Sequence, residues 1–357
     1  MPVDEKTLAE AFGGRIVFIT GADGFIGSHL TEWMVAAGAD TRVFVRATSS
    51  DELHNIRHLR GRIRVYRGNL EDKTSVDRAI RDLRGTRDAI IFHLAAQAHV
   101  GESWERPYET LYSNVVGTMN LLQSIVDLGV EVFKIDTAGT SEEYGNVHEE
   151  MRSQHDFHND GSLILHERSP INPKSIYATT KLASDFLTMN YFDAYGLPGV
   201  TTRMFNNYGP RQNPRYVTGT IISQALTHQE VRLGNVQAKR DFCYVGDGVL
   251  GHIHVALHGN PGEVYVYGQG RNISIQEWFN LIVEIGRREG CWKNPALVLE
   301  PSRQRPGASD VEELLVGYQK LHRLTGWEPR VSWEEGLRRT IRWYRENREA
   351  WIGRVDW

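Results

Sequence analysis

TGADGFIGSHL, residues 20–30, carries the strongest structural signal in this chain. It follows RIVFIT, a β-branched and aromatic run that predicts a buried strand, and it opens FIGSHLTEWMVAAG, which has helical periodicity. Gly21, Gly24 and Gly27 stand between these two predicted elements. Glycine permits a tight turn and a close approach of the backbone to a diphosphate, while the N–H groups and the dipole of the helix face the anion. The GxxGxxG spacing therefore predicts a dinucleotide-binding turn.

The same alternation of strand and helix continues downstream. Apolar runs at residues 41–45, 63–70, 88–96 and 130–136 are separated by helical patterns, of which the longest lies at 107–127. This order predicts the α/β class, with a Rossmann-like, doubly wound parallel sheet. A helix at 173–195 and a strand at 198–206 follow, after which the pattern becomes less regular.

The change in regularity predicts two lobes. We expect residues 1–206 to form an NAD(P)-binding Rossmann-like domain, with a return segment at about 241–269. Residues 207–240 and 270–357 are expected to form a smaller C-terminal α/β lobe that binds the substrate.

Composition narrows the class of function. The chain has 357 residues, 24% of them charged, and a formal charge of −4, which gives no general attraction to nucleic acid or anionic lipid. Cys243 and Cys291 lie far apart without metal-ligand spacing, which favours a reducing, cytoplasmic setting. No apolar run has the length of a signal peptide core or of a membrane span. We therefore expect no nucleic-acid partner and no membrane partner.

The residues after the second predicted strand bear on the choice of cofactor. An NAD site has an acidic residue near this point for the ribose diol, whereas an Arg accommodates a 2′-phosphate. Arg46 stands here, and the first acidic residue after it is Asp51. This pattern favours NADP over NAD, although an exposed Arg on a loop remains the alternative.

Tyr177 and Lys181 form the first candidate catalytic pair. They lie four residues apart in SIYATTKLASDFL, so both share one face of a predicted helix. A nearby ammonium group lowers the pKa of a phenol, which makes Tyr177 a candidate base. Thr140, at the end of the strand predicted from EVFKID, can hydrogen-bond the hydroxyl that Tyr177 deprotonates. The alternative for YxxxK alone is the surface of an amphipathic helix.

Taken with the motifs GADGFIG, TSEEYG, YATTK, RMFNNYGPRQNP and KRDFCYVGD, the chain resembles the extended short-chain dehydrogenase/reductase family. Within it, the similarity is to the nucleotide-sugar epimerases and dehydratases, and it runs from about Arg15 to Tyr344. The resemblance implies a tightly held nicotinamide cofactor, a nucleotide-diphosphate sugar substrate and a homodimer. It also implies a triad of Thr140, Tyr177 and Lys181.

The resemblance implies further contacts with both ligands. Residues expected at the cofactor are Gly21, Asp23, Gly24, Phe25, Ile26, Gly27, Arg46, Asn69, Leu70, Leu94, Ala95, Ala96, Asn114, Tyr177 and Lys181. Residues expected at the substrate are Ser103, Ser141, Asn206, Arg211, Arg240 and Arg305, of which the last two are expected to clamp the diphosphate.

Glu142 points to one reaction within this family. In the 4,6-dehydratases a Glu at the matching position removes the proton from sugar carbon 5 after oxidation at carbon 4. Ser141 precedes it, as in GDP-mannose 4,6-dehydratases, so Glu142 would act as both base and acid. Glu143 departs from the apolar residue usual before YG. A 4-epimerase, a UDP-glucuronate decarboxylase and a non-catalytic NAD(P)-sensing protein remain alternatives.

The segment between Gly145 and Tyr177 is longer than is typical of the family. It contains His155, His158 and His166, but their spacing does not match a zinc site. We expect no metal here and favour a loop that covers the substrate.

Overall fold

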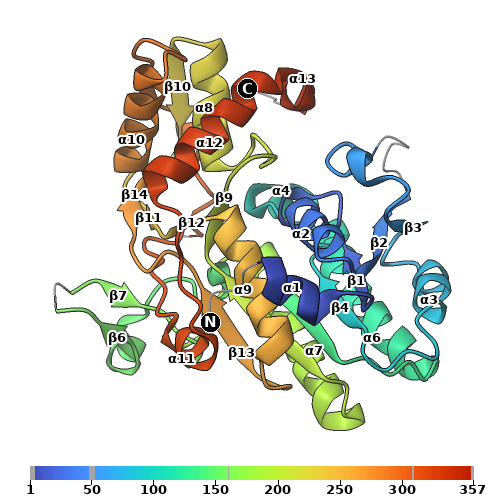
Figure 1. Ribbon diagram of the computed structural model, residues 1–357. Coiled ribbons are helices and arrows are strands. Elements are labelled where there is room, and N and C mark those ends of the chain that lie inside the picture. The colour runs from blue at the N-terminus through green and yellow to red at the C-terminus, as the bar shows by residue number, and fades with distance from the viewer. Residues whose placement is uncertain (1–4, 48–52, 160, 308, 355–357) are drawn as a thin grey trace.

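A seven-stranded parallel sheet forms the centre of the computed structural model, which describes residues 5–47, 53–159, 161–307 and 309–354. The strand order is β13-β8-β5-β4-β1-β2-β3 (Figure 1). The strands are β1 (Ile16–Thr20), β2 (Asp40–Arg46), β3 (Arg64–Gly68), β4 (Ile90–His93), β5 (Lys134–Thr140), β8 (Gly199–Met204) and β13 (Val264–Tyr267). This confirms the predicted α/β class and doubly wound sheet. The order reverses between β1 and β4, which is where ligands bind in such sheets.

Alternate residues of the strands face two separate hydrophobic layers. Val17 and Ile19 of β1 pack in one core cluster, whereas Phe18 between them packs in the other. Helices α1 (Glu5–Phe12), α2 (Phe25–Ala36) and α9 (Val245–His258) contribute to the first cluster. Helices α3 (Lys73–Arg81), α6 (Gly117–Asp127) and α7 (Ile176–Tyr195) contribute to the second. Burial on both faces explains why the strand sequences are almost continuously apolar.

The remaining elements gather largely beyond one end of the sheet (Figure 1). The helices there are α8 (Val217–Thr227), α10 (Ile275–Arg288), α12 (Trp333–Glu346) and α13 (Arg348–Trp351), with α11 (Gln319–Thr325) nearer the sheet. Paired short strands are β6 (Asp156–Phe157) with β7 (Leu163–Ile164), β9 (Asn206–Tyr208) with β12 (Phe242–Tyr244), β10 (Glu230–Leu233) with β15 (Ala296–Leu299), and β11 (Lys239–Arg240) with β14 (Ile273–Ser274). One core cluster continues from α2 to α10 and α12. The predicted boundaries between the two lobes therefore stay a prediction.

Two elements near the predicted site differ from expectation. The strand predicted at 130–136 begins at Lys134 and runs on to Thr140, so the polar residues Thr137 and Thr140 belong to it. The helix predicted at 107–127 is divided into α5 (Pro107–Leu111), a π-helical turn (Tyr112–Val116) and α6. The short helix α4 (Val100–Glu105) precedes them. Such π-helical turns are frequent at functional sites, and this one carries Asn114.

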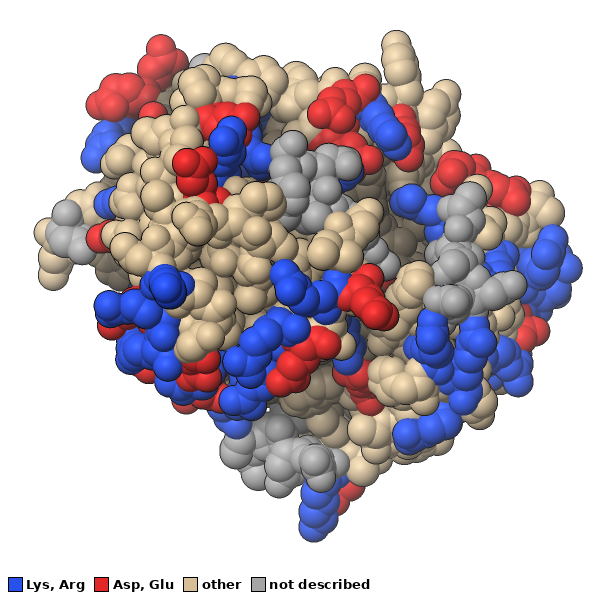
Figure 2. Space-filling model, turned by 90° about the horizontal axis from the view of Figure 1, so that it is seen from above, with Lys and Arg blue, Asp and Glu red and all other residues tan. Residues whose placement is uncertain are grey.

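The surface mixes both signs of charge. On the face drawn in Figure 2, Lys and Arg side chains are interspersed with Asp and Glu, with the basic side chains denser toward one edge. Across the described ranges, no helix is both long enough and apolar enough to cross a bilayer.

Candidate active site

The glycine turn between β1 and α2 can be built only with glycine. Gly21 has φ of +72°, and a Cβ atom added to it would lie 2.9 Å from Cα of Ala95. A Cβ on Gly27 would lie 2.2 Å from the carbonyl oxygen of Gly21. Gly24 is the N-cap of α2 and supplies no side-chain hydrogen bond. The first turn of α2 therefore presents backbone N–H groups to the crevice, a cradle that fits the diphosphate of a nicotinamide dinucleotide.

The other predicted cofactor residues surround this turn. Asn55 holds Asp23 by donating its backbone N–H to Oδ1 at 2.9 Å and its side-chain amide to the Asp23 carbonyl at 2.7 Å. Arg46 ends β2 and is exposed, while Asp51 lies outside the described residues. Phe25 and Ile26 begin α2. Asn69 and Leu70 follow β3, and Leu94, Ala95 and Ala96 follow β4, so these residues lie at the carboxyl ends of neighbouring strands.

The structure brings Thr140 and Tyr177 together. Thr140 is the last residue of β5, and Tyr177 lies in the first turn of α7, where Ser175 caps the helix by accepting the Ala178 N–H at 3.1 Å. Tyr177 and Lys181 are both buried. Asn114 donates its amide to the Thr180 hydroxyl at 2.9 Å, which ties the π-helical turn to the same stretch of α7.

The expected pKa of Tyr177 is corrected. The spacing of Tyr177 and Lys181 predicts a lowered pKa, but burial raises the pKa of Tyr177 above its ordinary value, and the nearby Tyr216, Glu142 and Glu143 add to this effect. A hydrogen bond with Thr140 opposes the increase. Burial also lowers the pKa of Lys181, and Asp185 and Glu143 oppose that decrease, whereas Lys181 is not among the main influences on Tyr177.

A chain of buried hydrogen bonds lies beside this pair and was not predicted. His93 at the end of β4 bonds Thr20 of β1 through Nδ1 and Thr118 of α6 through Nε2, each at 2.9 Å. Burial, with Lys181 nearby, lowers the pKa of His93 to about 3, so the imidazole is neutral at physiological pH. Thr118 in turn donates to Ser184 of α7 at 3.2 Å. The HLAA motif was a signal for His93, but its partners come from three distant elements.

Glu142 lies in the short 3₁₀ turn Ser141–Glu143 directly after Thr140, and its carboxylate is buried. Arg305 donates two hydrogen bonds to it, from Nη1 at 2.9 Å and from Nη2 at 3.1 Å. Burial alone raises the pKa of Glu142, but the charges of Arg305 and Arg240 outweigh burial and hold it below its ordinary value. Glu142 is thus an ionised carboxylate, and the two predicted diphosphate clamps face it.

The other predicted substrate residues are placed less uniformly. The Oδ1 atom of Asn206 in β9 is buried and has no hydrogen-bond partner among the described residues. Ser141 is buried beside Glu142. Arg211 instead donates to Glu32 of α2 at 2.5 Å. The fully buried Ser103 donates to the Val100 carbonyl at 2.6 Å. Substrate contacts of these four residues stay predictions.

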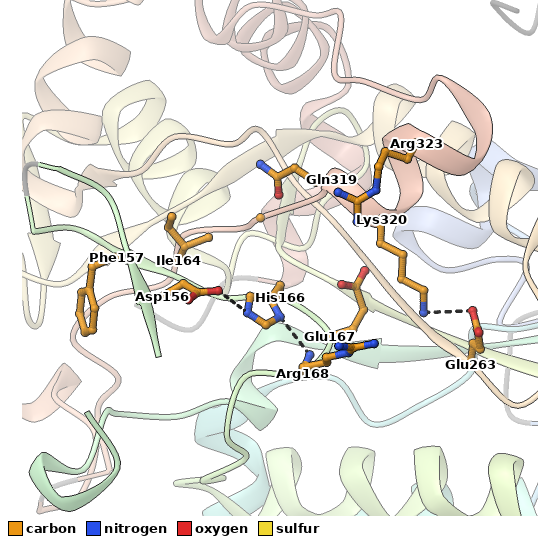
Figure 3. Close-up of a pocket in the computed structure, with 11 residues that line it drawn as sticks. Asp156, Phe157, Ile164, His166, Glu167, Arg168, Glu263, Gln319, Lys320 and Arg323 are labelled. Atoms are coloured by element: carbon orange, nitrogen blue, oxygen red, sulfur yellow. Dashed lines mark hydrogen bonds and ion pairs between the residues drawn. The ribbon is translucent and has the colours of Figure 1, made fainter. Parts of the chain in front are cut away.

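The histidines of the long segment do not form a metal cluster in the part of the chain that the structure describes. His166 instead bonds Asp156 at 2.8 Å, and both line a cavity of about 760 Å³ with Lys320, which pairs with Glu263 at 3.2 Å (Figure 3). None of the predicted site residues lines this cavity. The catalytic candidates lie elsewhere, at the end of β5 and the start of α7.

The pairing of Arg305 with Glu142 predicts a specific stability change. Arg305→Met leaves a buried carboxylate without its main partner and should lower the free energy of unfolding by about 2 kcal/mol or more at neutral pH. The lowered pKa means that the ionised pair stabilises the fold above the unfolded pKa of Glu142 and that this stabilisation is lost as pH falls through the folded pKa. The difference between variant and parent in chemical denaturation should therefore shrink in acid.

The double variant Arg305→Met with Glu142→Gln is the control, since it removes the unpaired charge and should recover part of the loss. A simple sum of the two single effects would contradict a direct interaction.

The comparisons with known proteins agree with this geometry. The sequence model of the GDP-mannose 4,6-dehydratase family matches residues 18–340. A mouse dTDP-D-glucose 4,6-dehydratase is 29% identical over 343 residues, covering 94% of this chain and 90% of the relative. The crystal structure of DesIV, a dTDP-glucose 4,6-dehydratase from Streptomyces venezuelae with NAD bound, is 29% identical with a TM-score of 0.81 and covers 95% of this chain and 100% of its own.

An epimerase is also similar. The NAD complex of the Thermus thermophilus UDP-glucose 4-epimerase is 31% identical, with a TM-score of 0.79, and covers 93% of this chain and 99% of its own. The match of the family model over most of the chain confirms the resemblance found in the sequence motifs. The chain belongs to the GDP-mannose 4,6-dehydratase family.

Proposed function

We propose that this protein is an NDP-hexose 4,6-dehydratase that uses a tightly bound nicotinamide cofactor. The observation that carries the proposal is the buried, ionised carboxylate of Glu142 two residues beyond Thr140, beside the phenol of Tyr177. The dehydratase relatives and the family match support the same reaction. A carboxylate at this point is needed for elimination but not for simple epimerisation.

The chain's own residues divide the proton transfers. Burial keeps the phenol of Tyr177 neutral until added positive charge lowers its pKa; the phenolate then takes the proton of the carbon 4 hydroxyl, while the hydroxyl of Thr140 hydrogen-bonds the same oxygen and Lys181 stabilises the phenolate. When bound, the nicotinamide would supply a positive charge, the hydride acceptor for carbon 4 and the hydride donor for carbon 6. Glu142 then removes the proton from carbon 5, which the ketone at carbon 4 has acidified. Because Ser141 cannot act as an acid here, Glu142 also protonates the carbon 6 hydroxyl that leaves as water. Carbon 5 regains a proton as the hydride returns, and Tyr177 gives up the proton that it took, so the net change is the loss of one water.

Arg305 must change partners for this scheme to work. In the structure its guanidinium occupies both carboxylate oxygens of Glu142. A substrate diphosphate offers the same fork-like acceptor geometry, and Arg240, whose pKa is influenced by both Glu142 and Arg305, is near enough to share that charge. Transfer of Arg305 to the diphosphate would free Glu142 and raise its pKa, since burial then acts without the opposing charge. Substrate binding would thus produce the active base.

The reaction is tested by the mass of the product. Incubation with a panel of GDP-, UDP- and dTDP-hexoses should give a product that lacks one water, detected by mass spectrometry. Loss of carbon dioxide from UDP-glucuronate would identify a decarboxylase instead, and a sole product of unchanged mass would identify a 4-epimerase. Absence of turnover with cofactor still bound would favour the non-catalytic NAD(P)-sensing alternative.

The roles of Glu142 and Tyr177 predict different blocks. Glu142→Gln should still allow substrate to reduce the bound cofactor, because oxidation at carbon 4 precedes its step, but should lower the yield of dehydrated product by about 10²-fold or more. Tyr177→Phe should prevent the reduction of the cofactor by substrate, so the absorbance of reduced nicotinamide should not appear. Parental turnover by the Gln variant would remove Glu142 from the mechanism.

We propose NADP rather than NAD as the preferred cofactor. Arg46 supports this choice because it ends β2 and its exposed guanidinium can pair with a 2′-phosphate. DesIV and the Thermus thermophilus epimerase were solved with NAD, which makes NAD the competing outcome. Calorimetric titration of cofactor-stripped protein should give tighter binding of NADP, and Arg46→Ala should remove the difference. Tighter binding of NAD by the parent protein would overturn the preference.

We further propose a cytoplasmic homodimer in which residues 207–240 and 270–357 form the sugar-nucleotide lobe. Support for the dimer comes from exposed apolar side chains on the neighbouring segments α5 to α7, including Tyr108, Tyr112, Phe186 and Tyr195. Free Cys243 and Cys291 are compatible with a reducing compartment. Light scattering in solution measures the proposed assembly directly.

A further inference from the structure

A buried cluster of four charged side chains lies next to the candidate catalytic residues. It consists of Glu143 from the 3₁₀ turn, Lys181 and Asp185 from α7, and Arg203 from β8. Glu143 and Asp185 are fully buried, and Lys181 and Arg203 are each 4% exposed. Charges at this depth persist only when they are paired, so their arrangement decides the electrostatics around Lys181.

Glu143 connects Thr140 to the cluster. Its Oε1 atom accepts the backbone N–H of Thr140 at 2.8 Å, while the Thr140 hydroxyl caps the same turn. This reciprocal pair is a capping box built on the candidate catalytic residue. The second oxygen, Oε2, lies 2.7 Å from Nε of Arg203. Glu143 therefore fixes the backbone of Thr140 to the neighbouring strand.

Asp185 connects the same point to α7. It lies four residues after Lys181, one helical turn away, and its Oδ2 atom accepts Nε–H of Arg203 at 2.8 Å. A Cβ added to Gly139 would lie 2.9 Å from Cγ of Arg203, 3.0 Å from Oε1 of Glu143 and 3.1 Å from Oδ1 of Asp185. The close contact around Gly139 holds the two carboxyl groups against one guanidinium.

Two carboxylates in this space favour the retention of one proton. Burial raises the pKa of Glu143 well above its ordinary value, and the neighbouring Asp185 raises it further, against the opposing effect of Arg203. Glu143 Oε2 and Asp185 Oδ1 are both buried, and neither oxygen has a hydrogen-bond partner among the described residues, so each is available to share a proton. A pair that shares one proton carries a single negative charge, and Asp185 and Glu143 oppose the decrease that burial causes in the pKa of Lys181.

We propose that Glu143 is a positioning residue that shares one proton with Asp185 and thereby holds Thr140 and Lys181 in register with Tyr177. The expected effect on the rate of cofactor reduction rests on the proposed function, whereas the proton shared by Glu143 and Asp185 does not. It assigns a role to the residue at which this chain departs from the apolar residue expected before Tyr144 and Gly145.

Two substitutions separate positioning from simple packing. Glu143→Val removes the acceptor for the Thr140 N–H and the shared proton, whereas Glu143→Gln keeps an oxygen acceptor for that N–H and an N–H donor for Asp185. We expect Glu143→Val to lower the single-turnover rate of cofactor reduction by substrate about tenfold or more, with KM changed less than about threefold. Glu143→Gln should restore most of the rate.

A second measurement needs neither cofactor nor substrate. The infrared difference spectrum between the parent protein and Glu143→Val at neutral pH should contain the carbonyl band of a protonated carboxylic acid. If none of the NDP-hexoses reduces the cofactor of the parent protein but the band is present, the proposed function is refuted and the shared proton is supported. Absence of the band, or a Val variant with lowered thermal stability but the parental rate, would overturn the role proposed for Glu143.

Discussion

The structure depends on one close contact between two backbone segments. The carbonyl oxygen of Gly21 lies where a side chain of residue 27 would begin, and Ala95, two residues beyond β4, lies 2.9 Å from the place of a Cβ atom on Gly21. This contact sets the first turn of α2 onto the carboxyl edge of the sheet at the point where the strand order reverses. Every candidate catalytic group then enters from the same edge, because parallel strands end together. A side chain in this turn would separate the helix from the sheet and displace the cradle for the diphosphate.

Charge, rather than shape, organises the site built on that edge. Glu142 and Glu143 are adjacent in sequence and both are buried, yet their environments are opposite. Arg305 and Arg240 hold the pKa of Glu142 below its ordinary value, whereas burial and the neighbouring Asp185 raise the pKa of Glu143. One carboxyl group is thus suited to removing a proton from a ligand, and its neighbour is suited to holding the backbone. Glu142 and Glu143 are successive residues of one 3₁₀ turn, but their side chains reach different partners, Arg305 for Glu142 and Arg203 for Glu143.

The buried hydrogen bonds around His93 hold together the strands and helices that form this edge. They join β1, β4, α6 and α7 through the side chains of Thr20, His93, Thr118 and Ser184. A neutral imidazole can bond both hydroxyl groups without adding charge near Lys181. The elements that carry the glycine turn, Asn114 and the Tyr177 helix are consequently fixed relative to one another, which a catalytic arrangement requires.

Local sequence was sufficient for the sheet, the glycine turn and the identity of Thr140, Glu142, Tyr177 and Lys181 as candidates, because strand and helix periods dictate which residues share an edge or a face. It was not sufficient for the partners of the buried charges. Arg305 reaches Glu142 across 163 residues, and Arg203 joins Glu143 to Asp185 from another strand. The expectation that Lys181 lowers the pKa of Tyr177 was wrong for the same reason. The pKa of a buried group depends on every charge and every loss of solvent around it, and those are set by the packing of segments that no local spacing relates.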